Sequence, residues 1–179
     1  AADRAVFGFG TDVERLGYAQ YDGDWPRFCV EVLGHRQWAF QKATLRRLWE
    51  KRLVSVAGPR SCSKTETGAQ AVLAMGSTGP TTCYTTSGSG QQVTMGLWQR
   101  IRAMHASSRL PLPGEPSGHK WEIAPEWFAY GFSADKAEQQ PSWPTTRYIL
   151  AALIEGLGGN KMLTEISQQE CIKCIVRSS

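Results

Sequence analysis

A chain of 179 residues, 41% of them hydrophobic, is long enough for one domain with a buried core and too short for two domains of ordinary size. Its formal charge of +4 suits a polyanionic partner, but many proteins without one are equally basic. No apolar run approaches the roughly 20 residues that span a bilayer, so we expect a soluble protein that does not enter the membrane.

The cysteines indicate a reducing environment. There are five of them, an odd and scattered set without a secretory signal, which favours a cytosolic setting. Cys171 and Cys174 form a lone CxxC with no second pair and no nearby His. A buried strand explains this pair better than a zinc site does.

The first half of the chain begins without a clear pattern. Residues 1–34 are dotted with Gly and Asp, and we treat them as an N-terminal extension without assigned elements. From His35 to Lys51 apolar residues recur at helical spacing, which predicts an amphipathic helix. Leu53–Ala57 is a short β-prone run, typical of a central strand covered on both faces. A second helix is predicted from Lys64 through Met75.

Strands and helices continue to alternate after that helix. Strands are predicted at Thr82–Thr86, Trp121–Ile123, Trp127–Gly131, Tyr148–Ile154 and Ile172–Val176, helices at Gln91–His105 and Lys161–Gln169, and a loop at Arg109–Lys120. This alternation predicts a three-layer α/β domain over residues 35–179, with a mostly parallel central sheet. The last strand runs straight into the final residues, so we expect the domain to be incomplete at its C-terminus.

The most informative motif lies between the run at 53–57 and the helix that begins at Lys64. Gly58-Pro59-Arg60-Ser61-Cys62-Ser63-Lys64-Thr65 fits the phosphate-loop pattern GxxxxGKT at every fixed position but one. In such a loop, backbone N–H groups form an anion cradle at the positive end of the helix. Lys64 would reach the β- and γ-phosphates of ATP, and the Thr65 hydroxyl would bind Mg²⁺.

One residue departs from the phosphate-loop pattern, and a second interpretation of the loop is open. Ser63 stands where the pattern has Gly, and its Cβ is expected to strain a turn that needs close backbone approach. The plainer alternative is a Gly-Pro turn that joins a strand to a helix and leaves Lys64 solvated. The predicted strand before the loop and the helix after it favour nucleotide binding.

Several further segments resemble the large subunit of viral DNA-packaging terminases. They are Phe40-Gln41 ("WQ"), Thr85–Val93 ("TAPTxRQV"), Leu97–Arg102 ("LWxxIR") and Gly131–Asp135 ("GxSAD"). The resemblance covers residues 36–179 and implies a three-layer P-loop NTPase fold. It implies that Gln41 recognises adenine, although Gln37 is close enough to be the alternative, and that Arg60 acts near the γ-phosphate.

The resemblance also implies a second nucleotide motif, in which an apolar strand ends in Asp-Glu. Here Glu155 follows the strand and takes the place of the catalytic Glu, while Ile154 occupies the Asp position. Isoleucine offers no oxygen to Mg²⁺ or its waters, so we expect weakened metal affinity and turnover. The acidic nuclease cluster of the family has no counterpart in this sequence.

By resemblance, the chain is then the ATP-hydrolysing motor domain of a terminase. Double-stranded viral DNA, a portal, a small terminase subunit and neighbours in a homo-oligomeric ring would be its partners, in the host cell cytoplasm. Two alternatives remain open. One is a degenerate, prophage-derived remnant that binds nucleotide without turnover, and the other is a different, helicase-like P-loop ATPase.

Overall fold

A computed structural model describes residues 17–51, 54–57, 62–87, 89–133 and 148–150. Its helical elements are η1 (Tyr18–Tyr21), α2 (Trp25–Glu31), α3 (Ala39–Glu50), α4 (Lys64–Thr78), α5 (Gly90–Gln92), η2 (Val93–Leu97) and α6 (Trp98–Ala106). Its strands are β1 (Thr82–Ser87), β2 (Lys120–Ala124), β3 (Trp127–Ser133) and β4 (Tyr148–Leu150). The described chain is therefore a mixture of helices and strands.

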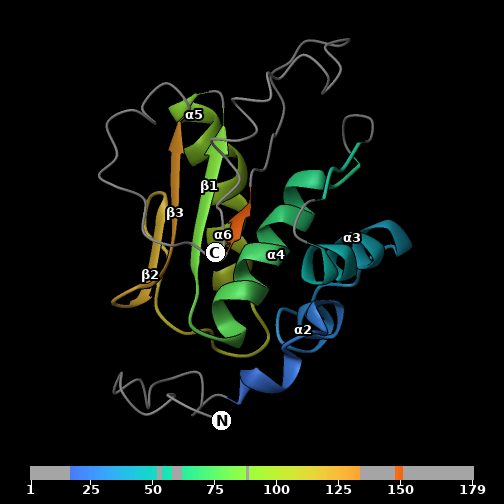
Figure 1. The fold of residues 1–179 in the computed structure, drawn as a ribbon. Helices are drawn as coiled ribbons and strands as arrows, with labels where there is room; N and C mark the ends of the chain where they lie inside the picture. Colours follow the sequence, from blue (N-terminus) through green and yellow to red (C-terminus); the bar gives the residue numbers. More distant parts are fainter. Residues whose placement is uncertain (1–16, 52–53, 58–61, 88, 134–147, 151–179) are drawn as a thin grey trace.

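The strands form one mixed sheet in the order β2-β3-β1-β4. β1 lies parallel to both β3 and β4, whereas β2 is antiparallel to β3. The register pairs Ser87 with Ser133, so β1 and β3 end side by side at the same edge of the sheet. Figure 1 shows these two strands pointing toward the end of the molecule where α5 lies.

Helix α4 is the centre of the packing. It contacts α2, α3, α6 and the strands β1 and β3, and Figure 1 shows it between the sheet and the pair α2–α3. Most of its residues from Ala69 onward are buried. On the sheet face toward α4, Trp127 donates a hydrogen bond from Nε1 to the carbonyl oxygen of Gly76 at 2.9 Å. On the opposite face, Tyr84 meets Phe128 and Phe132 edge to face.

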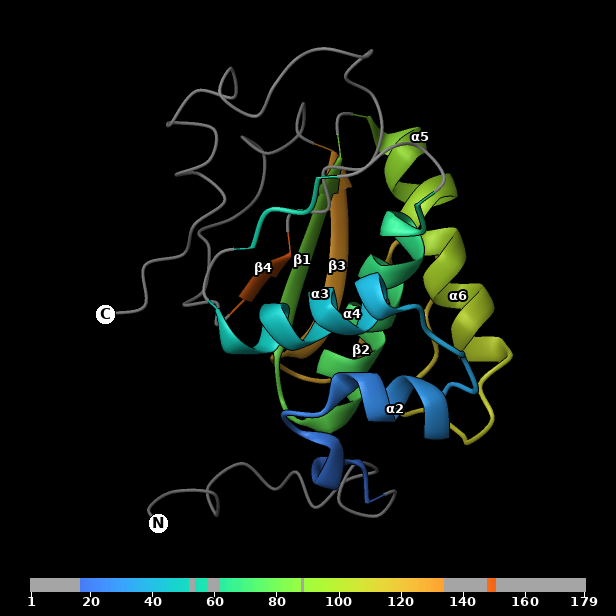
Figure 2. The same cartoon turned by 90° about the vertical axis from the view of Figure 1, so that its right-hand side faces the viewer.

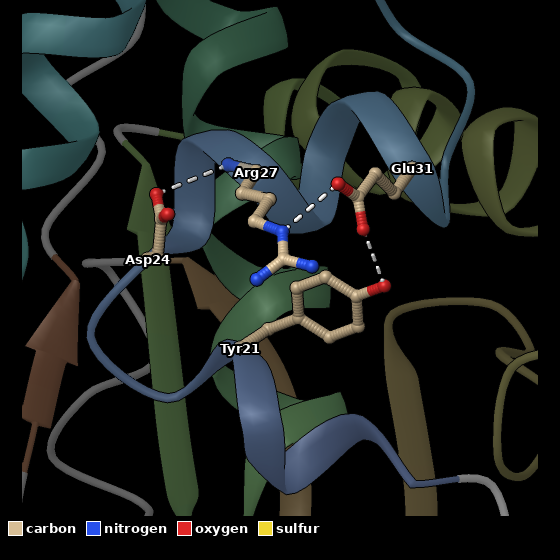
Figure 3. A network of polar contacts seen from close by, with 4 residues as sticks. All are labelled: Tyr21, Asp24, Arg27 and Glu31. Atoms are coloured by element: carbon tan, nitrogen blue, oxygen red, sulfur yellow. Dashed lines mark hydrogen bonds and ion pairs between the residues drawn. The ribbon is translucent and has the colours of Figure 1, made fainter.

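The stretch that could not be assigned from its sequence contributes to this core. Trp25, Phe28 and Cys29 of α2 are fully buried or nearly so. The outer side of α2 is held by polar contacts, shown in Figure 3. The hydroxyl of Tyr21 and the Nε of Arg27 donate to the two oxygens of the Glu31 carboxylate, at 2.8 and 2.9 Å.

Several predicted elements are confirmed. The helix predicted from Lys64 runs to Thr78, the one predicted from His35 begins later, at Ala39, and β1, β2 and β3 occupy the predicted places. The helix predicted at 91–105 is present but contains the π-helical segment η2. β4 confirms the start of the strand predicted at 148–154. The predicted elements at 161–169 and 172–176 lie outside the described residues.

The strand predicted at Leu53–Ala57 is wrong for the part that the structure describes. Val54–Ala57 has no regular structure, and Ser55 and Ala57 are exposed. Both edges of β1 are already occupied, by β3 and β4. The segment instead runs beside α3 and forms with it a groove of about 210 Å³, lined on the helix side by Phe40, Ala43, Thr44 and Arg47.

Candidate phosphate-binding site

The candidate site lies at the N-terminus of α4. The helix begins at Lys64, directly after Ser63. Figure 1 places this end of α4 at the same end of the molecule as the carboxyl ends of β1 and β3. In open α/β sheets, ligands bind at the carboxyl ends of parallel strands, and helix N-termini there carry partial positive charge.

Ser63 has a left-handed backbone conformation. Its φ and ψ are 62° and 24°, in the left-handed region, where residues other than Gly are uncommon. The phosphate-loop pattern has Gly there, and the observed dihedrals give the physical reason. The Ser63 side chain makes no capping hydrogen bond to the helix. The Cβ of Ser63 therefore adds strain, of the order of 1 kcal/mol, without a compensating cap.

The residues around Ser63 hold the turn together. Lys64 folds back along the chain, and its Nζ donates to the Sγ of Cys62 at 3.4 Å. Thr67 donates from both its backbone N–H and its hydroxyl to the carbonyl oxygen of Ser63, each at 2.9 Å. Thr65 lies half-buried between them. The ammonium group of Lys64 is thus kept at the loop, beside the first turn of α4.

An acidic side chain borders the site. Glu66 lies in the first turn of α4, where a carboxylate is stabilised by the helix dipole. Its Oε1 lies 3.8 Å from Nδ1 of His35, a pair that attracts only when the imidazole is protonated. A bound phosphate would therefore share the positive end of α4 with this carboxylate.

The glutamines proposed for adenine recognition are both buried, and each has a structural contact. The Oε1 of Gln41 accepts a hydrogen bond from the backbone N–H of Trp38 at 3.0 Å, which caps the start of α3. The Nε2 of Gln37 donates to the Oε1 of Gln70 on α4 at 3.3 Å. No hydrogen bond or ion pair found in the described part of the chain joins Gln41 to Ser63 or Lys64.

The other predicted site residues lie outside the described residues. They are Gly58, Pro59, Arg60 and Ser61 of the loop, together with Ile154 and Glu155 of the second motif. The structure therefore brings together Cys62, Ser63, Lys64 and Thr65 and places Gln41 in a helix cap.

A polar turn follows β1, and its position near this site was not predicted from the sequence. Ser87 ends β1, and its hydroxyl donates to the Oε1 of Gln92 at 2.9 Å. Ser89 caps α5 by accepting from the backbone N–H of Gln92 at 3.3 Å. The hydroxyl oxygen of Thr86 is buried and has no hydrogen-bond partner within the described ranges. Because β1 ends at the same edge as the start of α4, these hydroxyls lie toward the same end of the molecule (Figure 1).

No family model matches the chain, and no curated protein or solved structure is similar to it. Within the residues that the structure describes, no group of three or more His, Cys, Asp or Glu side chains could hold a metal ion. None of the described helices is long and apolar enough to cross a membrane.

Proposed function

We propose that residues 58–65 bind the phosphates of ATP with Mg²⁺, within a three-layer P-loop NTPase fold. The observation that carries this proposal is the left-handed Ser63, followed at once by Lys64 and a 15-residue helix. A Gly-Pro turn that merely joined two elements would not need a left-handed residue at position 63, the second of the two Gly positions of the motif. The parallel strands β1, β3 and β4 and the location of α4 also support it.

The chemistry follows from the residues at this turn. Backbone N–H groups in the first turn of α4 attract anionic oxygens, and the charge of Lys64 adds to that attraction. Lys64 would leave Cys62 and contact the β- and γ-phosphates, and Thr65 would bind Mg²⁺ through its hydroxyl. Arg60 would lie near the γ-phosphate, and Glu155 would polarise the attacking water. Gln41 would contact adenine only if its hydrogen bond to the backbone N–H of Trp38, at the start of α3, were broken.

The biological role that we propose is that of the motor domain of a terminase large subunit, which hydrolyses ATP to package viral DNA. Its partners would be double-stranded viral DNA, the portal, the small terminase subunit and further copies of itself in a ring, in the host cell cytoplasm. This part of the proposal is supported by the order and spacing of the segments that resemble the family.

A second candidate is a remnant that binds nucleotide without hydrolysing it. Ile154 removes the carboxylate expected to help hold Mg²⁺, and Val54–Ala57 lies outside the sheet that should anchor the loop. A loop anchored by a strand is held more rigidly than one preceded by irregular chain, so the second observation favours weak binding.

The test is ATP binding by calorimetry, with and without Mg²⁺, on the unmodified chain, on Lys64→Ala and on the matched control Lys120→Ala. Lys120 is an exposed lysine on β2 that pairs with Glu122. We expect binding that Lys64→Ala removes and Lys120→Ala retains. Equal binding by the unmodified chain and Lys64→Ala would refute the phosphate loop. ATP binding that does not depend on Mg²⁺, together with an absence of ATP hydrolysis, would favour the remnant that binds nucleotide without turnover.

A further inference from the structure

The exposed aromatic side chains of the described residues gather on α3 and its N-terminal cap. Trp38 is 75% exposed, Phe40 40% and Trp49 38%. Trp49 is partly supported by Trp25, which it meets edge to face at 5.7 Å. Trp38 has no ring contact of this kind within the described part of the chain. A tryptophan ring left open to water at this level has apolar area to offer a ligand.

The same helix is strongly basic. Residues 36–51 contain five Lys or Arg and one acid, Glu50. The cations are Arg36, Lys42, Arg46, Arg47 and Lys51, all of them exposed. Among the described residues, none of these cations belongs to an ion pair. Their charges are therefore available to an anionic partner.

The spacing joins the two features into one stripe. Lys42 and Arg46 are four residues apart on α3, which places them on one side of the helix about 6 Å apart along its axis, and Trp38, four residues before Lys42, is the N-cap of the same helix. The side of α3 that carries Gln41, Thr44 and Leu45 is buried. Figure 2 shows α3 lying across α4, with its outer side free of other described elements in that view.

We infer that the outer face of α3 binds single-stranded nucleic acid, with Trp38 stacking on an unpaired base and Lys42 and Arg46 contacting phosphates. Flat aromatic side chains beside cations are how single strands are bound without sequence preference. A duplex keeps its bases stacked inside, so it would use the cations but not the Trp38 ring. This surface does not involve Lys64, and the inference stands apart from the proposed nucleotide site.

A membrane surface is a less suitable partner for the same helix. Interfacial helices bury a continuous apolar face among the lipids. In α3 the face that carries Leu45 is already packed in the protein core. The exposed aromatics stand among cations, an arrangement that fits a partner with both charge and flat rings.

The experiment measures binding of a fluorescent oligothymidylate of about 20 nucleotides by anisotropy, at several salt concentrations, alongside a duplex of equal length. We expect the single strand to bind more tightly than the duplex. Trp38→Ala should weaken single-strand binding roughly tenfold while changing duplex binding little. Lys42→Glu with Arg46→Glu should weaken both and reduce the salt slope of single-strand binding by about 1.4, or about 0.7 for each phosphate that is no longer neutralised.

Arg100→Glu is the matched control, because Arg100 is also exposed but lies on α6. It should retain oligothymidylate binding, and so should Lys64→Ala, which separates this surface from the nucleotide site. The inference is overturned if Trp38→Ala binds the single strand as well as the unmodified chain, if Arg100→Glu weakens binding as much as the α3 changes, or if the duplex binds more tightly. Tighter binding to vesicles with anionic lipid than to the oligonucleotide would overturn it in favour of a membrane.

Discussion

The two ends of α4 differ in how tightly they are packed and in how polar they are. At the N-terminal end, residues 62–66 are half-buried and polar, and a left-handed serine leaves the helix without a side-chain cap. At the C-terminal end, Gly76 is packed so tightly that the room left by its missing side chain is taken by the ring of Trp121. A helix held firmly at one end can leave its other end open to a ligand at little cost to the stability of the domain.

The largest effect is expected at the packed end. A Cβ on Gly76 would overlap the six-membered ring of Trp121, which is itself fully buried. Gly76→Ala should therefore lower the free energy of unfolding by about 3 kcal/mol, the upper part of the range for overpacked cores. Gly96→Ala is the control, because a Cβ there meets open space. Urea unfolding measures both, and equal stability of the two variants would show that the packed end tolerates more than the contact implies.

The next effect is expected at the middle of α4, where Gln70 meets Gln37. Both residues are buried, and the Nε2 of Gln70 and the Oε1 of Gln37 lack partners within the described ranges. Gln70→Met should cost about 1–3 kcal/mol, because it removes the buried hydrogen bond that the Nε2 of Gln37 donates to Gln70. The double variant with Gln37→Met should recover most of that loss. If the double variant is less stable than either single variant, the side-chain amides of Gln37 and Gln70 must have further hydrogen-bond partners besides each other.

A smaller effect, of opposite sign, is expected at the open end. Ser63→Gly relieves the left-handed strain and should raise the free energy of unfolding by about 0.5–1 kcal/mol, since no capping bond is removed. Ser63→Ala keeps the strain and should change stability little. ATP affinity of Ser63→Gly, measured by calorimetry, should equal or exceed that of the unmodified chain. Weaker binding would mean that the serine hydroxyl itself contacts the ligand.

The smallest effect appears only when the pH is lowered. Burial lowers the pKa of His105, which meets the Trp121 ring edge to face at 5.8 Å. The unfolded chain therefore takes up the proton first, so this contribution to stability is complete above the ordinary histidine pKa of about 6.5 and is lost as the pH falls below it. His105→Gln should flatten the loss of stability between about pH 7.5 and about pH 5.5 in urea unfolding. A loss of stability over this range that is as steep in His105→Gln as in the unmodified chain would contradict this.

Local pattern was enough for much of the fold. The helices at α3 and α4 and the strands β1, β2 and β3 were predictable, because apolar spacing reports which side of an element faces the core. The start of α4 at Lys64 was predictable too, because the motif and the helical pattern after it are contiguous in the sequence.

Other features depend on residues that are distant in the sequence. η1 and α2 were not predicted, although Trp25, Phe28, Cys29 and Val32 recur at helical spacing after the capping Asp24; what only the structure showed is that they are buried against α3 and α4. Val54–Ala57 has a strand-like composition, but a strand also needs a partner, and the segment pairs with none of the described strands.

What the sequence by itself determined was therefore most of the helices and strands and the start of α4 at Lys64, since these arise from neighbouring residues. Only the tertiary structure decided that Gly76 lies under Trp121, that Gln37 meets Gln70 and that the other described residues leave the outer face of α3 exposed. The physical reason is that burial is a property of pairs of elements. A side chain is covered or left free by what the rest of the chain places against it.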